Sequence, residues 1–172
     1  MCANHARPLQ PNAALGPKAV AEERLTFLNL RAVSRPHLFE AARSLIGTAE
    51  PRGPALVVAQ AAVEVGVETA IDFALQLRDV HDPLREWVGT YVTSWSPTND
   101  RVQGLWTALT GDKISAAPGW AAYKEGTKWR HAFVHRAMGV SEEQAASFIT
   151  AAEQVVDHIV GVMTREFPTS TA

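Results

Sequence analysis

Cysteine, net charge and uninterrupted apolar segments are all scarce in this sequence. Cys2 is the single cysteine among 172 residues, which excludes a disulfide within the chain and a cluster of metal-bound thiolates. The formal net charge of −2 provides no overall basic field that would attract nucleic acid, so any such site must be a local patch. The longest apolar stretch, Leu56 to Val67, is interrupted by Gln60 and Glu64 and is too short to span a bilayer.

The first residues also lack the continuous apolar segment of a secretory signal, so we expect a cytoplasmic protein that makes no contact with a membrane. Apolar residues make up 47% and charged residues 20% of the chain, as in ordinary globular proteins. The length fits one domain with a sizeable core. We place this domain at residues 18–167, after a flexible arm at 1–17 and before a frayed tail at 168–172.

Apolar residues recur at helical spacing along most of the chain, and no strand-length run alternates between apolar and polar residues. The sequence therefore predicts an all-α helical bundle with six or seven helical segments. Their expected ranges are 18–32, 34–47, 54–78, 83–92, 99–110, 118–138 and 142–166. The segments at 54–78, 118–138 and 142–166 have the clearest periodicity and should dominate the fold.

Several helix ends are marked in the sequence. Asn99 is a candidate N-cap, and Gly111 is placed to stop the same helix. Gly139 is placed to end the next long helix, and Ser141 with Gln144 has the spacing of a capping box for the last one. Leu105, Trp106 and Leu109 should form the buried side of the helix expected at 99–110. Trp87, Trp95 and Trp106 should lie in the core or in an interface.

Polar residues spaced four apart mark one side of the helix expected at 54–78. They are Gln60, Glu64, Glu68, Asp72 and Gln76. Like charges one turn apart destabilise a helix by a few tenths of a kcal/mol, roughly, for each pair. This acidic stripe is interpreted either as a solvated face or as a set of carboxylates of which one orients a cation in a cleft.

The segment from Trp120 to Gly139 combines positive charge with aromatic side chains. Four basic residues stand against one glutamate, a formal excess of +3, and four aromatic residues lie among them. Such a combination is typical of surfaces that contact a nucleotide or an RNA strand, by pairing with phosphate and stacking on bases. Lys124, Lys128 and Arg136 are the candidate substrate-binding residues. The alternative is the basic outer face of an ordinary amphipathic helix.

Arg130, His131 and His135 form the pattern Arg-His-x-x-x-His near the end of this helix. A histidine with a pKa near neutrality can accept or return a proton at a ribose 2′-hydroxyl or at the leaving oxygen. A guanidinium can hold a phosphate and offset the charge of the transition state. These residue types therefore suit RNA cleavage without a metal or a cofactor.

The stretch from Arg130 to His135 resembles the signature of HEPN domains (higher eukaryotes and prokaryotes nucleotide-binding). That signature is an arginine followed after four to six residues by a histidine, usually with a polar residue directly after the arginine. His131 occupies this polar position, where asparagine is commoner. The resemblance extends over about 99–159 and includes the Leu-Thr-Gly-Asp turn at 109–112 and the Pro-Gly-Trp at 118–120.

The resemblance implies a bundle of four or five helices and a homodimer in which the two motif-bearing helices face each other across a cleft. Many members are metal-independent ribonucleases of toxin–antitoxin, abortive-infection or CRISPR-linked defence systems. Arg130 and His135 would be the catalytic pair and His131 an accessory polar residue. A cognate antitoxin or a nucleotidyltransferase is a possible partner. One toxin group carries a modified tyrosine two positions after the histidine, and this chain has Ala137 there.

Three other interpretations remain open. His131 and His135 have the spacing of a metal-binding pair, but Ala132 stands where zinc helices carry a glutamate, and we expect no metal. His135 and Arg136 also suit the C-terminus of a helix, where cations are favoured. Finally, some members of the resembling family do not cleave RNA, so the chain is alternatively a non-catalytic module that binds a nucleotide or a protein and dimerises.

Overall fold

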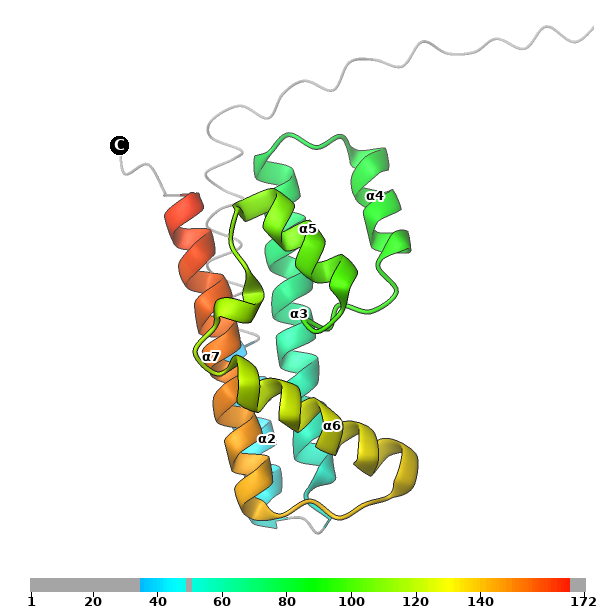
Figure 1. Cartoon of the computed structure of the whole chain (residues 1–172), viewed down its shortest axis with the longest axis vertical. Helices are drawn as coiled ribbons and strands as arrows, with labels where there is room; N and C mark the ends of the chain where they lie inside the picture. Colours follow the sequence, from blue (N-terminus) through cyan, green and yellow to red (C-terminus); the bar gives the residue numbers. More distant parts are fainter. Residues whose placement is uncertain (1–34, 49–50, 168–172) are drawn as a thin grey trace, which may run out of the picture.

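The computed structural model describes residues 35–48 and 51–167, and within them the chain forms six α-helices, one short 3₁₀ helix and no strand (Figure 1). The elements are α2 (Arg35–Thr48), α3 (Gly53–Leu77), α4 (Asp82–Tyr91), α5 (Asp100–Thr110), the 3₁₀ helix η1 (Ile114–Ala116), α6 (Trp120–Arg136) and α7 (Glu142–Glu166). The all-α prediction is confirmed. The helix expected at 18–32, the arm at 1–17 and the tail at 168–172 lie outside the described residues.

Two 25-residue helices, α3 and α7, form the centre of the bundle. They pack against each other along their length, α2 covers one side, and α6 packs against both of them near one end (Figure 1). Their facing sides are apolar and nearly inaccessible to solvent. The largest side chains of this kind on α3 and α7 are Leu56, Ile71, Phe148, Ile149 and Ile159. Burial of this apolar surface is the main force that stabilises the bundle.

The helix ends follow most of the predicted signals. The Asn99 side chain accepts a hydrogen bond from the backbone N–H of Arg101, Gly111 adopts a left-handed conformation with φ 72°, and Ser141 with Gln144 forms the capping box. Gly139, however, does not end α6. The helix stops at Arg136, and Ala137 takes the left-handed position with φ 52°. The backbone N–H groups of residues 137 and 138 already satisfy the last carbonyls there, so the helix closes two residues before Gly139.

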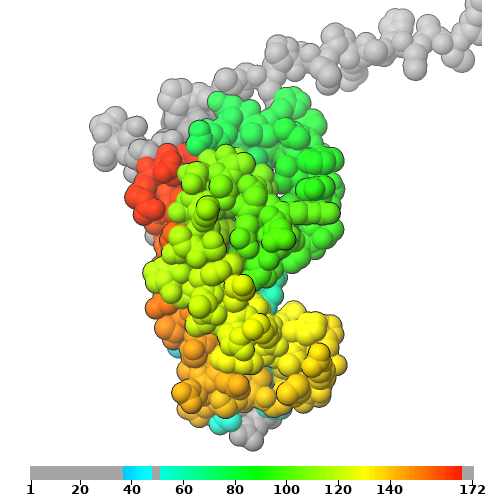
Figure 2. Space-filling view, viewed as in Figure 1, coloured from blue at the N-terminus to red at the C-terminus, as the bar shows by residue number. Residues whose placement is uncertain are grey.

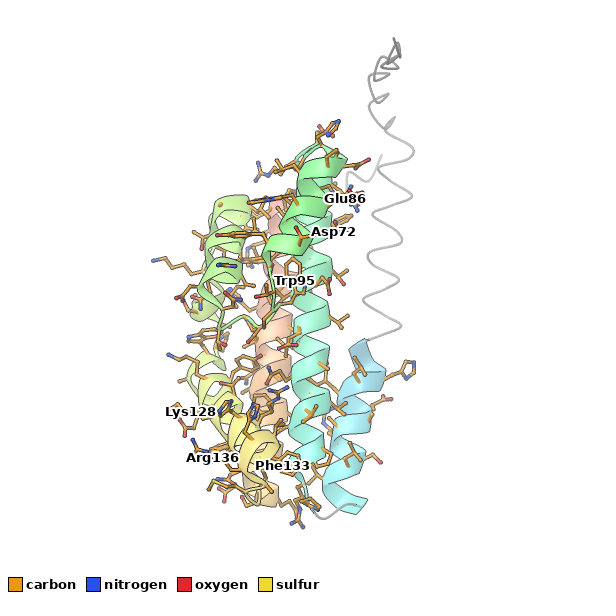
Figure 3. The ribbon with its side chains drawn as sticks, turned by 90° about the vertical axis from the view of Figure 1, so that its right-hand side faces the viewer. Asp72, Glu86, Trp95, Lys128, Phe133 and Arg136 are labelled. Atoms are coloured by element: carbon orange, nitrogen blue, oxygen red, sulfur yellow. The ribbon has the colours of Figure 1, made fainter. Side chains whose placement is uncertain are left out.

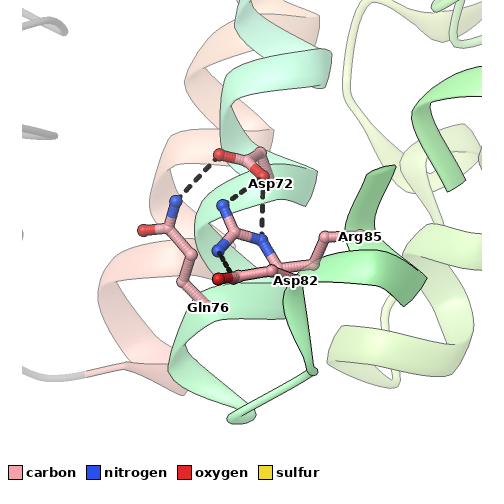
Figure 4. Close-up of polar contacts among 4 residues, drawn as sticks. All are labelled: Asp72, Gln76, Asp82 and Arg85. Carbon is pink, nitrogen blue, oxygen red and sulfur yellow. Dashed lines mark hydrogen bonds and ion pairs between the residues drawn. The ribbon is translucent and has the colours of Figure 1, made fainter. Parts of the chain in front are cut away.

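Helix α4 stands apart from the rest of the bundle and is fastened to it by charged contacts. Arg85 donates to Asp72 of α3 at 2.9 Å and to Asp82 of α4 at 3.1 Å, and Gln76 also donates to Asp72 (Figure 4). Asp72 therefore pairs with an arginine of the chain itself, but its side chain is 51% exposed, as the solvated-face interpretation of the acidic stripe expects. Glu68, one turn earlier, is exposed as a solvated face would be.

The tryptophans and the fifth helix are only partly as expected. Trp106 is fully buried, but Trp87 on α4 is 55% exposed and stacks on Tyr91, with 4.9 Å between ring centroids. The buried side of α5 consists of Val102, Trp106 and Thr110, whereas Leu105 and Leu109 are half-buried. Trp87 was predicted to lie in the core or in an interface. It does not lie in the core, because α4 does not pack closely enough on the bundle to cover it, and its place in an interface stays a prediction.

The Asp112 carboxylate contacts Trp106 and His158 and thereby joins the turn after α5 to α7, a contact that we call the clasp. Asp112 accepts a hydrogen bond from Trp106 Nε1 at 3.0 Å and lies 2.8 Å from Nε2 of His158 on α7. Burial raises the pKa of the Asp112 carboxyl, but the bonds from Trp106 and His158 lower it by more, so that the pKa lies below its ordinary value of 3.8. The clasp fixes the segment that leads into α6.

We predict that Asp112→Asn destabilises the protein by about 1.5–3 kcal/mol at pH 7, the range for a hydrogen bond to a charged group. The pKa of Asp112 is lower in the folded state than in the unfolded state. The stabilisation is therefore fully present at pH values above the pKa of the unfolded state, and it is lost as the pH falls through the pKa of the folded state. Thermal melts should therefore show the two proteins converging under acidic conditions. Glu68→Gln, which changes an exposed carboxylate, should show no such pH dependence. An equal difference at pH 7 and at pH 2 would contradict the role of the charge.

Gly126 allows α6 to approach α7. A Cβ atom on Gly126 would overlap the ring of Phe148, which lies fully buried on α7. Phe148 in turn stacks against Tyr123 of α6, with 5.4 Å between ring centroids. The absence of a side chain at one position of α6 therefore sets the distance between this helix and the centre of the bundle.

We predict that Gly126→Ala destabilises the protein by about 1–3 kcal/mol, the usual effect of overpacking a core. Gly104→Ala is the matched control, because Gly104 also lies inside a helix but a Cβ atom there would have no neighbour within 4 Å. That change should stabilise the protein by about 0.5–1 kcal/mol through helix propensity. Urea unfolding of both variants measures the difference, and a Gly126→Ala variant as stable as Gly104→Ala would refute the close approach.

Candidate functional site

The aromatic side chains of α6 hold the helix on the bundle. Tyr123 is fully buried between Trp120 and Phe148, with ring centroids 6.0 and 5.4 Å away. Trp129 and Phe133 are partly buried and pack against the same core. The expectation that these aromatic residues form a surface for stacking bases is therefore wrong for Tyr123, whose ring is covered on both faces.

A basic stripe runs along the solvent-exposed side of α6. Lys124, Lys128, His131 and His135 are all exposed, and their spacing of four, three and four residues places them on one face. The rings of His131 and His135 lie side by side, with 4.3 Å between their centroids. Lys128 is paired at 2.7 Å with Glu125, an ion pair that is exposed to solvent. The stripe thus groups two lysines and two histidines on one face, and Glu125 neutralises the charge of one of the lysines.

Arg130 lies away from this stripe. Five residues separate it from His135, which at roughly 100° per residue puts the two side chains about 140° apart around the helix. One copy of α6 therefore does not present Arg130 and His135 on the same face. Arg136 is exposed at the end of the helix, and Lys128 and Arg136 both project from this end of the molecule (Figure 3).

One part of the Arg130 side chain is buried in the bundle and the other part is accessible to solvent. Its Nε atom is buried and makes no hydrogen bond. Its side chain is only half-buried, its terminal nitrogens are not among the buried unsatisfied atoms, and no acidic side chain of the described residues pairs with it. Arg43 and Arg85, in contrast, are paired with Glu153 and Asp72. Arg130 therefore keeps its charge available for an anion.

Three segments contribute polar side chains to the surroundings of the Tyr123 hydroxyl on α6. Glu64 of α3 and Ser96 of the loop before α5 both act on this hydroxyl, as does Arg130, and Gln60 of α3 is bonded to Glu64. Gln60 Nε2 donates to Glu64 at 2.7 Å, while Gln60 Oε1 and the Tyr123 hydroxyl are buried without a partner of good geometry. The surface is hollowed between α6 and the part of the chain that carries α4 and α5, and α3 is visible at the floor (Figure 2).

Several of these neighbours affect the pKa of the Tyr123 hydroxyl. Burial raises its pKa far above the ordinary value of 10, and the negative charge of Glu64 raises it further, whereas Ser96 and Arg130 lower it. The phenol therefore stays protonated at physiological pH and acts as a neutral hydrogen-bonding group. Leaving a buried polar atom without a partner costs about 1–3 kcal/mol, and such local violations are concentrated at functional sites.

Sequence analysis identified Arg130, His131 and His135 but missed the contribution of Gln60, Ser96 and Tyr123. Gln60 did give a signal, because it interrupts the longest apolar stretch of the chain. The structure shows that this polar side chain points into a buried cluster, where it is 9% exposed. Tyr123 gave no signal of its own, since a tyrosine in an amphipathic helix is usually packed with its hydroxyl in water.

Two other kinds of site were considered. Among the described residues, no group of three histidine, cysteine, aspartate or glutamate side chains is arranged to hold a metal ion. Helix α3 is long and apolar enough to cross a membrane, and half of its most apolar window is buried inside the bundle. The core helix of a soluble protein has the same properties, so this feature is weak evidence for a membrane.

Comparison with known proteins adds no assignment: no family model, curated protein or solved structure matches the chain. Function must therefore be argued from the residues and their geometry.

Proposed function

We propose that this chain is a HEPN-like, metal-independent endoribonuclease that uses Arg130, His131 and His135. The observation that carries the proposal is the guanidinium of Arg130, which pairs with no carboxylate of the described residues and whose Nε is held inside the bundle, on the same helix as an exposed pair of histidines. An available arginine binds phosphate, and a solvent-accessible histidine exchanges protons near neutral pH. Lys124, Lys128 and Arg136 add positive charge that attracts the RNA backbone.

The reaction needs one proton acceptor, one proton donor and a positive charge. His135 accepts the proton of a ribose 2′-hydroxyl, the 2′-oxygen attacks the adjacent phosphorus, and the bond to the 5′-oxygen breaks. The products are a 2′,3′-cyclic phosphate and a free 5′-hydroxyl, which receives a proton from a second imidazole. The Arg130 guanidinium offsets the negative charge that builds on the phosphate oxygens.

The geometry of α6 supports a homodimer as part of the proposal. Because Arg130 and His135 point about 140° apart, one copy of the helix cannot direct both at the same phosphate, whereas Arg130 of one copy and the partner's His135 can converge across a two-fold axis. The end of α6 also offers apolar surface to such an interface, since Val134 is 46% and Met138 53% exposed.

The resemblance of the motif also guides the proposed cellular role. We propose a cytoplasmic toxin or defence-system ribonuclease whose activity is restrained by a cognate antitoxin or a partner nucleotidyltransferase. Ala137 occupies the position at which one toxin group carries the modified tyrosine, so restraint by modification at that position does not apply to this chain.

The second candidate function is a non-catalytic helical module that binds a nucleotide or a protein. The observation that favours it is the small extent of the basic surface: the net charge is −2, and Asp72 and Glu86 lie at the opposite end of the face that carries Lys128 and Arg136 (Figure 3). Incubation of the purified protein with RNA in EDTA separates the two functions, because only the ribonuclease produces fragments.

We predict that His135→Ala lowers metal-free RNA cleavage by about 10²–10⁴-fold, the usual contribution of general acid–base catalysis. Arg130→Lys should not restore full activity, because lysine lacks the planar fork of arginine. His131→Asn should be tolerated, since its role is to position the phosphate. All variants are assayed on one RNA in EDTA, with thermal melts to confirm folding. His81→Ala, which changes an exposed histidine before α4, is the control. If His135→Ala cleaves at the parental rate, the assignment of the active site is wrong.

We predict that the homodimer becomes tighter as salt is added. The basic stripes of the two copies repel each other, and this repulsion is screened when ionic strength rises from about 0.1 M to about 1 M, because the Debye length falls from about 10 Å to about 3 Å. Sedimentation velocity at both salt concentrations measures the change. Met138→Asp should weaken the dimer, whereas Leu84→Asp, at an exposed apolar residue of α4, should not. The opposite result for these two variants would place the interface at α4.

A further inference from the structure

Arg130 and Tyr123 lie seven residues apart on α6, close to two full turns, so both side chains point from one side of the helix. The Nε–H of Arg130 is buried without an acceptor, and the Tyr123 hydroxyl is buried without a partner of good geometry, although Ser96 acts on it as a hydrogen-bonding neighbour. Glu64 and Arg130 are both close enough to Tyr123 to act on it electrostatically. One side of α6 therefore carries a buried donor and a buried hydroxyl without good partners, and a carboxylate of α3 acts on the hydroxyl.

We propose that Tyr123, supported by Glu64 and Gln60, is a positioning residue that fixes the guanidinium of Arg130 for phosphate. When the terminal nitrogens of Arg130 bind a phosphate group, its Nε–H donates to the Tyr123 oxygen, and the Tyr123 hydroxyl donates to Glu64. Glu64 is already held by Gln60 Nε2 at 2.7 Å, so the carboxylate end of this chain of hydrogen bonds is in place before the ligand binds. The inference rests on the proposed function only for the identity of the anion as RNA.

A purely structural role for Tyr123 would not explain its hydroxyl. The ring alone provides the stacking on Trp120 and Phe148, and phenylalanine would supply the same contacts without an unsatisfied polar atom. The same reasoning applies to Gln60, a polar residue of α3 that is only 9% exposed. Gln60 and Tyr123 each bury a polar atom without a partner of good geometry, and the Nε of Arg130 on α6 is a third such atom.

If Tyr123 has this positioning role, Tyr123→Phe should not lower the melting temperature, but it should make the Arg130 side chain less well fixed. The variant keeps the ring and removes the hydroxyl, so its melting temperature should be unchanged or higher. The Nε–H of Arg130, observed by NMR and assigned by its loss in Arg130→Lys, should exchange with water faster when phosphate is bound. The probe is inorganic phosphate, titrated into the full-length protein. Glu64→Gln should produce the same change, because a neutral side chain holds the tyrosine proton less strongly.

Matched control variants separate this role from general effects of the substitutions. Tyr91→Phe removes a hydroxyl from an exposed tyrosine on α4, and Glu68→Gln neutralises an exposed carboxylate one turn from Glu64. Neither control should alter the Arg130 resonance. If Tyr123→Phe leaves the resonance and its exchange unchanged, or lowers the melting temperature as a core defect would, the positioning role is refuted.

Cleavage assays test the same role in the reaction. Tyr123→Phe should lower kcat by up to about 100-fold with little change in KM, because a misplaced guanidinium still binds the substrate but no longer fits the transition state. If the parent protein cleaves no RNA and the NMR effects are present, the proposed nuclease function fails and the positioning of Arg130 stands. If the parent cleaves RNA and Tyr123→Phe retains the parental kcat, the positioning role fails and the nuclease function stands.

Discussion

The approach of α6 to α7 at Gly126 governs the arrangement of every candidate functional residue. Phe148 of α7 occupies the space that a side chain at this position would fill, and its ring supports Tyr123 from one side. Because α6 is a rigid helix, this single contact also fixes the orientation of the residues around it. The side chain of Arg130 is thereby partly buried with its Nε inside the bundle, whereas His131 and His135 are exposed to solvent.

Several pairs of charged side chains join the elements of the bundle. Arg85 ties α4 to α3 through Asp72, Arg43 ties α2 to α7 through Glu153, and the clasp at Asp112 joins the turn before η1 to α7. Ion pairs of this kind at a surface each contribute little to stability. The two charges within a pair neutralise each other, so the pair adds no net charge to the surface. Arg130 differs, because its charge lies beside a buried cluster and without a carboxylate in contact among the described residues. The chemistry proposed for α6 depends on this difference.

Periodicity was sufficient to find the helices that the structure describes, because all of them except α4 bury an apolar face in a single core. Capping residues fixed several ends for local reasons, as at Asn99 and Ser141, where a side chain bonds to the backbone of its own helix. Local signals failed where the outcome depended on other elements. Gly139 was available to end α6, but the backbone hydrogen bonds closed earlier at Ala137, and Trp87 stayed exposed because no helix covers α4.

The sequence by itself determined the fold class, the helices and the residue types available for chemistry on α6, since each depends on spacing within one segment. Only the tertiary structure decided which of these side chains share surroundings. It separated Arg130 from His135 around the helix, used Tyr123 for packing, and brought Glu64 of α3 close to the Tyr123 hydroxyl. The reason is that the contact between α3 and α6 depends on the shapes of the buried residues around Gly126. The spacing of residues along a single segment contains no information about how these shapes fit together.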